Sequence, residues 1–309
     1  MNERRPLSKE ELSSISLALE KCGIQDSLCV SRFIDTKLDK LYDVYLLDQG
    51  KKSILKKTTP AEYDMAIYTR YFSGHHFAVP KILNAITVGE DHFVRIEFAE
   101  GSDARGCTET DAKSIGKALA HIQSYYLTTG GWTENAKSYY RRQIGKHIEA
   151  IKPFYSEYAA VFDFVEQRFF EAPQTLIHDD LLPINVFLHD GSVQIIDWEY
   201  ADILPYFLDL GRFAFVCDMD NRLFINEEAA ESFLKQYYQQ MKKNPEFHIS
   251  EKAFRLDVAV SAFCQYVLFV ACSLNKTAVK SSLELCDSVD NNYLNKIILH
   301  LQSEFCKNK

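Results

Sequence analysis

Three polar side chains in the segment 176–200 have the types and spacing that phosphoryl transfer from ATP requires. Asp180 follows a short apolar run, Asn185 lies five residues later, and Asp197 stands one hairpin further along the chain. The reaction needs one carboxylate to accept the proton of the attacking hydroxyl. It also needs an amide oxygen and a second carboxylate to hold Mg2+ against the β- and γ-phosphates. This segment therefore contains candidates for all three roles.

A β-hairpin is the element that must position these groups. Residues 186–188 and 193–197 are short β-type runs, and Asp190 with Gly191 forms a turn between them. Because the arms of a hairpin run antiparallel, Asn185 and Asp197, at the outer ends of the two arms, are expected to return to the same edge. We expect Asp180 to lie on the loop that enters the hairpin.

The chain up to residue 98 predicts a small antiparallel sheet with one inserted helix. Ser8 and Glu11 form a capping-box pattern that begins a first helix, and Gly23 can end it. Five runs rich in β-branched and aromatic residues follow, and a helical stretch, 61–72, interrupts them. The five strand-like runs are 28–34, 41–47, 53–57, 79–88 and 92–99.

Beyond residue 98 the apolar residues recur at helical spacings of three and four. One such stripe comprises Ala112, Ile115, Leu119, Ile122 and Tyr126. The hairpin region is the one β-type interruption, and helical patterns resume near residue 226. We therefore expect an α+β fold of two lobes. Residues 1–98 would form an N-terminal nucleotide-binding lobe, and residues 99–309 a larger, mainly helical C-terminal lobe with the catalytic hairpin and the substrate site.

Composition narrows the class of protein. The chain has 309 residues, 47% of them hydrophobic, and a net charge of −8, which argues against a nucleic-acid-binding protein. The eight cysteines show no CxxC or zinc-type spacing, and the first residues lack the apolar core of a signal peptide. The apolar run 258–274 has 17 residues, short of the roughly 20 that a membrane span needs. We expect a cytoplasmic protein that binds neither nucleic acid nor membrane.

The catalytic segment resembles that of the aminoglycoside phosphotransferase and choline kinase superfamily, whose members are small-molecule kinases with a protein-kinase-like fold. The resemblance covers residues 53–57, 79–123 and 175–213. It implies that Asp180 is the catalytic base and that Asn185 and Asp197 are the Mg2+ ligands. It also implies that His178 braces the loop. Asp209, in the sequence PYFLDLGRF, would support the site.

The resemblance also assigns the nucleotide site. Lys56, in the sequence SILKK, would contact the α- and β-phosphates of ATP. Backbone groups around Glu97 and Ala99 would hydrogen-bond to adenine. The acidic partner of Lys56 should lie on the helical stretch 61–72, where Asp64 fits the pattern better than Glu62, although either could serve.

Two positions depart from the family pattern. No glycine-rich loop is visible at 34–40, between the first two strands of the predicted sheet. Asp179 stands where this family often has glycine and where protein kinases have arginine. This extra carboxylate could raise the pKa of Asp180, face a cationic substrate, or point to solvent. We favour the orientation toward solvent.

The phosphate acceptor is expected to be a small, hydroxyl-bearing and cationic molecule of the aminoglycoside or amino-alcohol type. The acidic net charge favours cations, and carboxylates and aromatic rings that could bind an ammonium group follow the metal aspartate. They are Glu199, Asp202, Asp218 and Asp220, with Trp198, Tyr200 and Tyr206. The alternative is that the acids solvate a loop and the rings are packing residues. The sequence IDWEYA is similar to the choline kinase branch, whereas Leu204 and the segment 211–213 depart from it.

Two other functions compete with a small-molecule kinase. The chain could be a catalytically inactive kinase-like binding or scaffold protein, but inactive relatives usually lose a member of the catalytic set, which is complete here. The doublet His178–Asp179 could also belong to a metal-dependent phosphohydrolase of the HD type. Those enzymes carry the doublet on a helix, whereas β-type sequence and Pro173 surround it here.

Overall fold

The computed structural model describes residues 3–24, 30–35, 40–58, 66–128, 134–215, 225–275 and 291–306. The chain groups into two compact units. The first unit comprises Met1–Gly101 and Gln194–Glu199, and the second comprises Ser102–Val193 and Tyr200–Lys309. A short segment far along the chain therefore belongs to the first unit.

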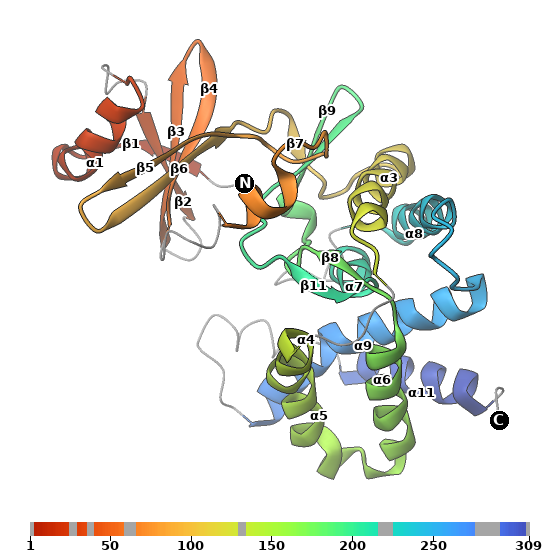
Figure 1. The fold of residues 1–309 in the computed structure, drawn as a ribbon. Helices are drawn as coiled ribbons and strands as arrows, with labels where there is room; N and C mark the ends of the chain where they lie inside the picture. The colour runs from red at the N-terminus through yellow and green to blue at the C-terminus, as the bar shows by residue number, and fades with distance from the viewer. Residues whose placement is uncertain are drawn as a thin grey trace. The chain divides into compact units, whose positions relative to one another are not determined.

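The first unit is built on a six-stranded antiparallel sheet with the order β1-β2-β3-β4-β6-β5 (Figure 1). Five strands occupy the predicted runs. The edge strand β1 was not predicted, because its sequence, ERRP, carries charge and no apolar alternation. The strands are β1 (Glu3–Pro6), β2 (Val30–Asp35), β3 (Lys40–Gln49), β4 (Lys51–Thr58), β5 (Ile82–Val88) and β6 (Asp91–Glu97).

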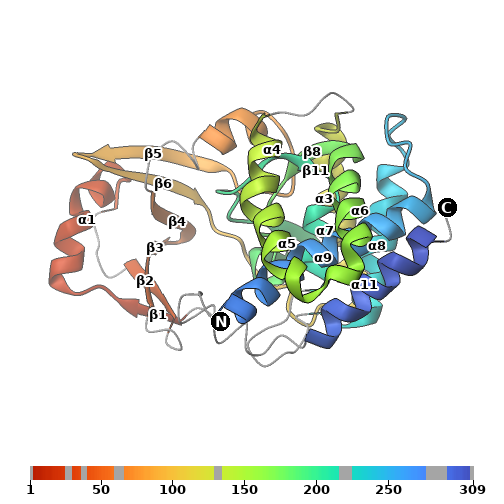
Figure 2. The same ribbon diagram turned by 90° about the horizontal axis from the view of Figure 1, so that it is seen from below.

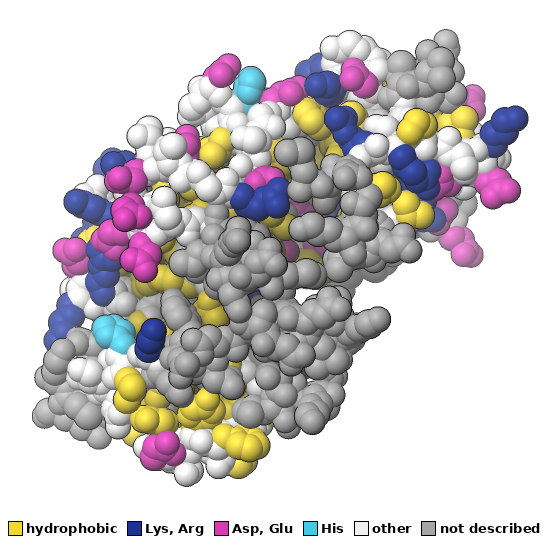
Figure 3. All heavy atoms as spheres, turned by 180° about the vertical axis from the view of Figure 1, so that it is seen from behind, with side chains coloured by type: hydrophobic (Ala, Val, Ile, Leu, Met, Phe, Trp, Pro, Cys, Tyr) yellow, Lys and Arg dark blue, Asp and Glu magenta, His cyan; other side chains and the backbone are white. Residues whose placement is uncertain are grey.

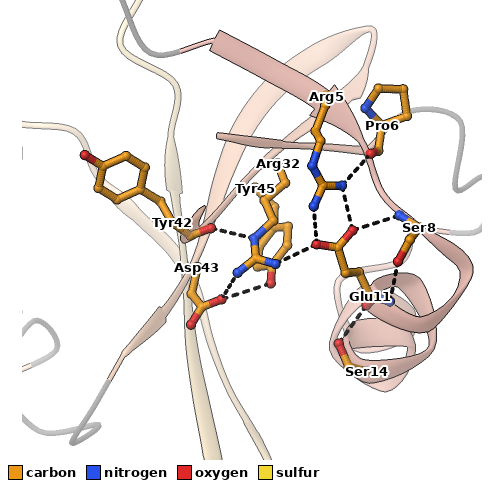
Figure 4. A network of polar contacts seen from close by, with 9 residues as sticks. All are labelled: Arg5, Pro6, Ser8, Glu11, Ser14, Arg32, Tyr42, Asp43 and Tyr45. Carbon is orange, nitrogen blue, oxygen red and sulfur yellow. Dashed lines mark hydrogen bonds and ion pairs between the residues drawn. The ribbon is translucent and has the colours of Figure 1, made fainter. Parts of the chain in front are cut away.

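Helix α1 (Lys9–Lys21) begins at the predicted capping box, in which Ser8 and Glu11 cap each other. Its apolar face, with Ile15, Ala18 and Leu19, packs in one cluster with buried side chains of the sheet. The Glu11 carboxylate accepts hydrogen bonds from Arg5 of β1 at 2.7 Å and from Arg32 of β2 at 2.7 Å (Figure 4). These guanidinium groups, with the Ser8 amide, hold the pKa of Glu11 well below its usual range. The first turn of α1 is therefore tied to two strands.

Part of the predicted helix 61–72 lies among the described residues. Tyr68–Phe72 forms a π-helical turn, η2, whereas residues 61–65 lie outside the described chain. Phe72 is buried and contacts Trp198 edge-on, with ring centroids 4.9 Å apart. The backbone amide of Ile195 also donates to the carbonyl of Ala78 at 2.7 Å. These contacts help to join Gln194–Glu199 to the first unit.

The second unit is mainly helical, and the expected α+β fold of the protein-kinase-like type is confirmed (Figure 2). None of the helices in the described ranges is long and apolar enough to cross a membrane. The α-helices are α3 (Glu109–Tyr125), α4 (Glu134–Tyr139), α5 (Lys146–Ile151), α6 (Ala159–Glu171), α7 (Leu208–Phe215), α8 (Glu227–Met241), α9 (Glu251–Asn275) and α11 (Asn291–Cys306). Shorter turns are η3 (Tyr140–Gly145), η4 (Lys152–Phe154), η5 (Ser156–Tyr158) and η6 (Pro183–Asn185).

Glycines permit close helix contacts in this unit. Helices α3 and α8 lie side by side in both ribbon views (Figures 1 and 2). A Cβ atom on Gly116 of α3 would lie 2.5 Å from the backbone oxygen of Phe233 in α8.

On the face shown in Figure 3, the Lys and Arg side chains of the described residues lie among Asp and Glu side chains.

Two small sheets frame the loop that contains Asp180. One has the order β10-β9-β7, and in the other β11 pairs antiparallel with β8, with Asp202 opposite Ile177. The predicted second hairpin strand, 193–197, is two residues too long: β10 ends at Ile195, because Asp197 has a φ of 66°, which a strand does not accommodate. These strands are β7 (Ser102–Asp103), β8 (Gln174–Ile177), β9 (Val186–His189), β10 (Ser192–Ile195) and β11 (Asp202–Pro205).

Candidate active site

The catalytic loop, residues 178–185, connects the fully buried strand β8 to β9. His178 is buried, and its Nδ1 accepts the backbone N–H of Asp180 at 3.2 Å. Asn185 donates from its Nδ2 to the backbone oxygen of Asp180 at 2.9 Å and faces the Asp180 carboxylate at 3.4 Å. The structure thus brings together His178, Asp180 and Asn185, three of the residues that the sequence analysis selected.

Asp209, on α7, binds the backbone at the start of the catalytic loop. Its carboxylate accepts the N–H groups of His178 at 2.8 Å and Asp179 at 3.0 Å, and the side-chain amide of Gln123 at 2.9 Å. Burial raises the pKa of Asp209 to about 7, and these hydrogen bonds oppose the rise. Gln123 is itself bound to the hydroxyl of Tyr237 of α8. A buried polar network therefore fixes the start of the catalytic loop.

Asp179 does not simply point to solvent, so the orientation favoured from the sequence is wrong. Its carboxylate is half-buried and accepts a hydrogen bond from the hydroxyl of Tyr139 at 2.6 Å. Burial raises the pKa of Asp179 to about 7, and the charges of Asp180 and Asp202 raise it further. The residue has a φ of 65°, which explains why glycine suits this position and why aspartate, which tolerates that region better than most residues, can stand there.

Arg212 is a site residue that the sequence analysis missed. Its guanidinium contacts Oδ1 of Asp180 through Nη2 at 2.5 Å and through Nε at 3.2 Å. Arg212 lies three residues after Asp209 on the same helix, so both project from one side of α7. The three-residue spacing from Asp209 is the feature of the sequence that could have identified Arg212.

Lys56 lies on β4, in the first unit, between strands β3 and β6. Its ammonium group contacts Asp197 at 2.8 Å and Glu199 at 2.7 Å. The neighbouring Lys57 pairs instead with Asp91, as alternation along a strand requires. The structure therefore brings Lys56 and Asp197 together. Glu199, expected to face the acceptor, is bound to Lys56.

The expected acidic partners of Lys56, Glu62 and Asp64, lie outside the described residues. At the end of β6, the N–H of Glu97 donates to the carbonyl of Lys81 at 2.9 Å, so this amide is already bonded to the residue before β5. Ala99 is buried and follows that strand. Contact of these backbone groups with adenine stays a prediction.

Two of the aromatic residues assigned to the acceptor belong to the core instead, so that expectation is wrong for them. Trp198 is fully buried and donates from its indole N–H to the carbonyl of Ile195 at 2.9 Å. Tyr206 is also fully buried, and its hydroxyl donates to Asp257 at 2.7 Å. Their rings offer no free face to an ammonium group.

The remaining acceptor candidates differ in exposure. Tyr200 is 60% exposed, and Asp202 is half-buried in β11, where it accepts the N–H of Ile203. Asp218 and Asp220 lie outside the described residues.

The two predicted metal ligands, an amide and a carboxylate, are of types that a hard divalent cation prefers. Over the described ranges, no group of three or more His, Cys, Asp and Glu side chains surrounds a common metal position. Asn185, in the second unit, carries an amide oxygen and Asp197, in the first, a carboxylate, and their role as Mg2+ ligands stays a prediction. Mg2+ typically takes one or two such protein ligands and completes its shell with phosphate oxygens and water.

Comparison with known proteins identifies proteins that are similar to this chain. Residues 42–243 match the model of the phosphotransferase enzyme family. Two proteins named LicA, from Haemophilus influenzae, are each 31% identical to this chain over 94 residues, or 30% of it. The match spans only 32% of one LicA protein and 25% of the other.

Solved structures share the fold at low sequence identity. An amicoumacin kinase in complex with AMP-PNP, Ca2+ and Ami is 14% identical, with 96% of each chain covered and a TM-score of 0.57. A choline/ethanolamine kinase family protein from Mesorhizobium loti is 12% identical, with coverage of 85% of this chain and 90% of that chain and a TM-score of 0.54. An aminoglycoside-3'-phosphotransferase of type VIII is 14% identical, with coverage of 82% and 98% and a TM-score of 0.51.

Proposed function

Because the chain belongs to the phosphotransferase enzyme family, we propose that it transfers the γ-phosphoryl group of ATP to a hydroxyl of a small cationic molecule. The observation that carries the proposal is the catalytic loop. Its Asp180 carboxylate lies beside Asn185, and buried Asp209 holds the loop backbone. Such a kinase would act in the cytoplasm, where ATP is available.

In the proposed reaction, the acceptor oxygen forms a bond to the γ-phosphorus while the bond between that phosphorus and the β,γ-bridging oxygen breaks. ADP leaves with the bonding electron pair, and the hydroxyl proton passes to Asp180. Oδ1 of Asp180 is bound by Arg212, so Oδ2 is the oxygen assigned to the proton. Positioning and charge stabilisation supply most of the rate acceleration in transfers of this kind.

The nucleotide would be bound by residues of the N-terminal sheet and of the catalytic segment. Lys56 would contact the α- and β-phosphates, and Asn185 and Asp197 would be ligands of Mg2+, which neutralises charge on the β- and γ-phosphates when bound. In the first unit Lys56 is already oriented by Asp197 and Glu199. Backbone groups near Glu97 and Ala99 would bind adenine.

Charge supports a cationic acceptor. The chain has a net charge of −8, and Asp179 and Asp202 raise the density of carboxylates next to Asp180. Among proteins of this fold, one was solved with hygromycin B and another is a choline/ethanolamine kinase family protein. Asp202 and Tyr200 are the described residues that we assign to the acceptor, and Asp218 is a further candidate.

A substrate screen with an active-site variant tests this function. Purified protein is mixed with ATP, Mg2+ and aminoglycosides, amino alcohols, sugars or nucleosides, and ADP formation is measured. For an accepted substrate, Asp180→Asn should lower kcat by about 10²–10⁴-fold with little change in ATP affinity. Asp190→Asn is the matched control, because Asp190 is a 92%-exposed turn residue of the adjoining hairpin. Turnover by Asp180→Asn at the rate of the control would contradict the assignment of the base.

The same screen decides between classes of acceptor. Turnover confined to sugars or nucleosides would contradict the cationic acceptor. ATP binding without turnover of any acceptor would point to an inactive kinase-like protein.

A further inference from the structure

Helix α7 contacts the catalytic loop at two points, and the family resemblance accounts for only one of them. Asp209 accepts backbone N–H groups at the start of the loop. Arg212, three residues later, reaches the side chain of Asp180. One short helix thus fixes both the backbone of the loop and the carboxylate that it presents.

The Arg212 contact is directed at one oxygen atom. Nη2 and Nε both donate to Oδ1 of Asp180, at 2.5 and 3.2 Å. The other oxygen, Oδ2, faces Nδ2 of Asn185 at the longer distance of 3.4 Å. Hydrogen bonds between two charged groups are roughly twice as strong as neutral ones, so the guanidinium sets the rotation of the carboxylate about its χ angles. Oδ2 is left as the more weakly bound oxygen.

Helix α7, which carries Arg212, is bound to α9 by hydrogen bonds. The N–H of Gly211 donates to Oγ of Ser261 in α9 at 2.8 Å, and that hydroxyl donates to the backbone oxygen of Phe207. A Cβ atom on Gly211 would lie 2.4 Å from Ser261 Oγ, which shows how close the two helices approach. One turn further along α9, Gln265 accepts a hydrogen bond from Nη1 of Arg212 at 3.3 Å. The guanidinium is therefore held from the side away from Asp180.

Burial distinguishes this ion pair from an ordinary surface pair. The side chains of Arg212 and Asp180 are 23% and 27% exposed, whereas those of Arg255 and Glu231, which pair between α9 and α8, are 40% and 55% exposed. Pairs as exposed as the latter contribute little to stability. The charge of Arg212 also opposes the raised pKa of Asp179, so it offsets part of the negative charge around the loop.

We propose that Arg212 is a positioning residue for phosphoryl transfer, which fixes the Asp180 carboxylate so that Oδ2 meets the acceptor hydroxyl. This inference rests on the proposed function. Arg212 acts through Asp180 and does not itself bind ATP or the acceptor. Its removal should therefore lower kcat and leave both Michaelis constants nearly unchanged.

The test compares Arg212→Ala and Arg212→Lys with the wild type, with an accepted substrate from the screen. Arg212→Ala should lower kcat by about 10–100-fold and change either KM by less than about threefold. Arg212→Lys should recover only part of the loss, because an ammonium group cannot make the two directed bonds of a guanidinium. Arg255→Ala, which removes the exposed pair with Glu231, is the matched control and should keep wild-type kcat.

Chemical rescue separates positioning from a structural effect. Guanidinium chloride at about 50 mM, far below a denaturing concentration, should raise kcat of Arg212→Ala severalfold in a saturable manner. It should not raise kcat of the wild type or of Asp180→Asn. A variant with lowered thermal stability and no response to guanidinium would show a structural role and overturn the inference.

The remaining outcomes also decide the question. If Arg212→Ala does not fold, Arg212→Lys, which keeps the charge and the aliphatic stem, must show the loss of kcat at unchanged melting temperature. Wild-type kcat in either variant overturns this inference alone. A wild-type protein that forms no ADP with any acceptor overturns the proposed function, and the inference falls with it.

Discussion

Asp179 brings a second carboxyl group to the catalytic loop, and its surroundings oppose ionisation. Burial raises its pKa to about 7, whereas a carboxyl group in an unfolded chain titrates near 3.9. At a pH between these two pKa values, the carboxyl group of Asp179 is protonated in the native state and loses its proton when the protein unfolds. Stability from this group is therefore greatest below about pH 4 and is lost as the pH rises through about 7. Asp209, whose pKa is also raised to about 7, acts in the same direction.

We expect Asp179→Asn to remove part of this pH dependence. Asparagine tolerates the positive φ and can still accept the Tyr139 hydrogen bond, but it does not ionise. The free energy of unfolding of the variant relative to the wild type should rise between about pH 4 and about pH 7. Urea unfolding at several pH values, without nucleotide or metal, measures it. A constant difference, such as we expect for Asp190→Asn, would contradict the raised pKa.

Asp197 is expected to couple nucleotide and metal affinity. The wild type should bind ATP more weakly when EDTA removes Mg2+, because Asp197 would hold the metal and the metal would offset the charge of the phosphates. Asp197→Ala should show the weaker affinity even with Mg2+ present, and EDTA should then have little further effect. Isothermal titration with a non-hydrolysable ATP analogue measures both. Equal affinity of the wild type with and without Mg2+ would rule out this metal site.

At the residue scale, the sequence predicted those groups whose spacing is local. Asp180, Asn185 and His178 fall within eight residues, so the pattern alone placed them on one loop. Arg212 and Tyr139 were not predicted as site residues, because their contacts with the loop join residues that are 32 and 40 positions apart in the sequence. Trp198 was assigned to a ligand because aromatic residues serve both cores and binding sites, and only packing distinguishes the two.

At the element scale, the contact between α7 and α9 depends on the absence of a side chain at Gly211. Gly211→Ala should destabilise the protein by about 1–3 kcal/mol, because a new methyl group must displace packed atoms. Replacing Ser261 by Ala in the same protein should recover little, since backbone atoms of residue 261 also lie within 2.8 Å of the new Cβ. Denaturant unfolding measures each change.

Gly145→Ala is the control for this prediction. Its Cβ would meet the Tyr140 ring at 3.2 Å, and a side chain can move where a backbone cannot. We expect a change of less than about 1 kcal/mol, because alanine also favours helical backbone. If Gly211→Ala proves as mild as Gly145→Ala, the two helices can separate without cost.

Elements with strong periodicity were predicted well. The capping box of α1, the stripe of α3 and five strands of the sheet match the structure, because each carries its signal in consecutive residues. Strand β1 and the end of β10 were not predicted. Pairing with β2 orders the charged run at residues 3–6, and the positive φ of Asp197 is a property of the folded backbone.

At the scale of the whole molecule, the first unit is discontinuous in sequence. Residues 194–199 return to it after the chain has entered the second unit. Periodicity could not reveal this return, because it depends on contacts such as that between Phe72 and Trp198. The division at residue 98, with a nucleotide-binding role for the first part, stays a prediction.

Trp198 should therefore contribute strongly to the stability of the first unit. Trp198→Ala removes a fully buried ring from its contact with Phe72 and should cost about 3–5 kcal/mol. Tyr200→Ala, two residues away and 60% exposed, should cost less than about 1 kcal/mol. Urea unfolding compares the two. A similar small effect of both substitutions would show that Gln194–Glu199 does not pack with the first unit.

The return of Gln194–Glu199 also sets an order of events during translation. Residues 1–101 are translated before residues 194–199, so Lys56 at first lacks its contacts with Asp197 and Glu199, and Phe72 lacks its contact with the indole ring. At typical elongation rates of about 5–20 residues per second, the missing segment follows on the order of ten seconds later. During that interval the part of the first unit that packs against Gln194–Glu199 is not yet covered by that segment.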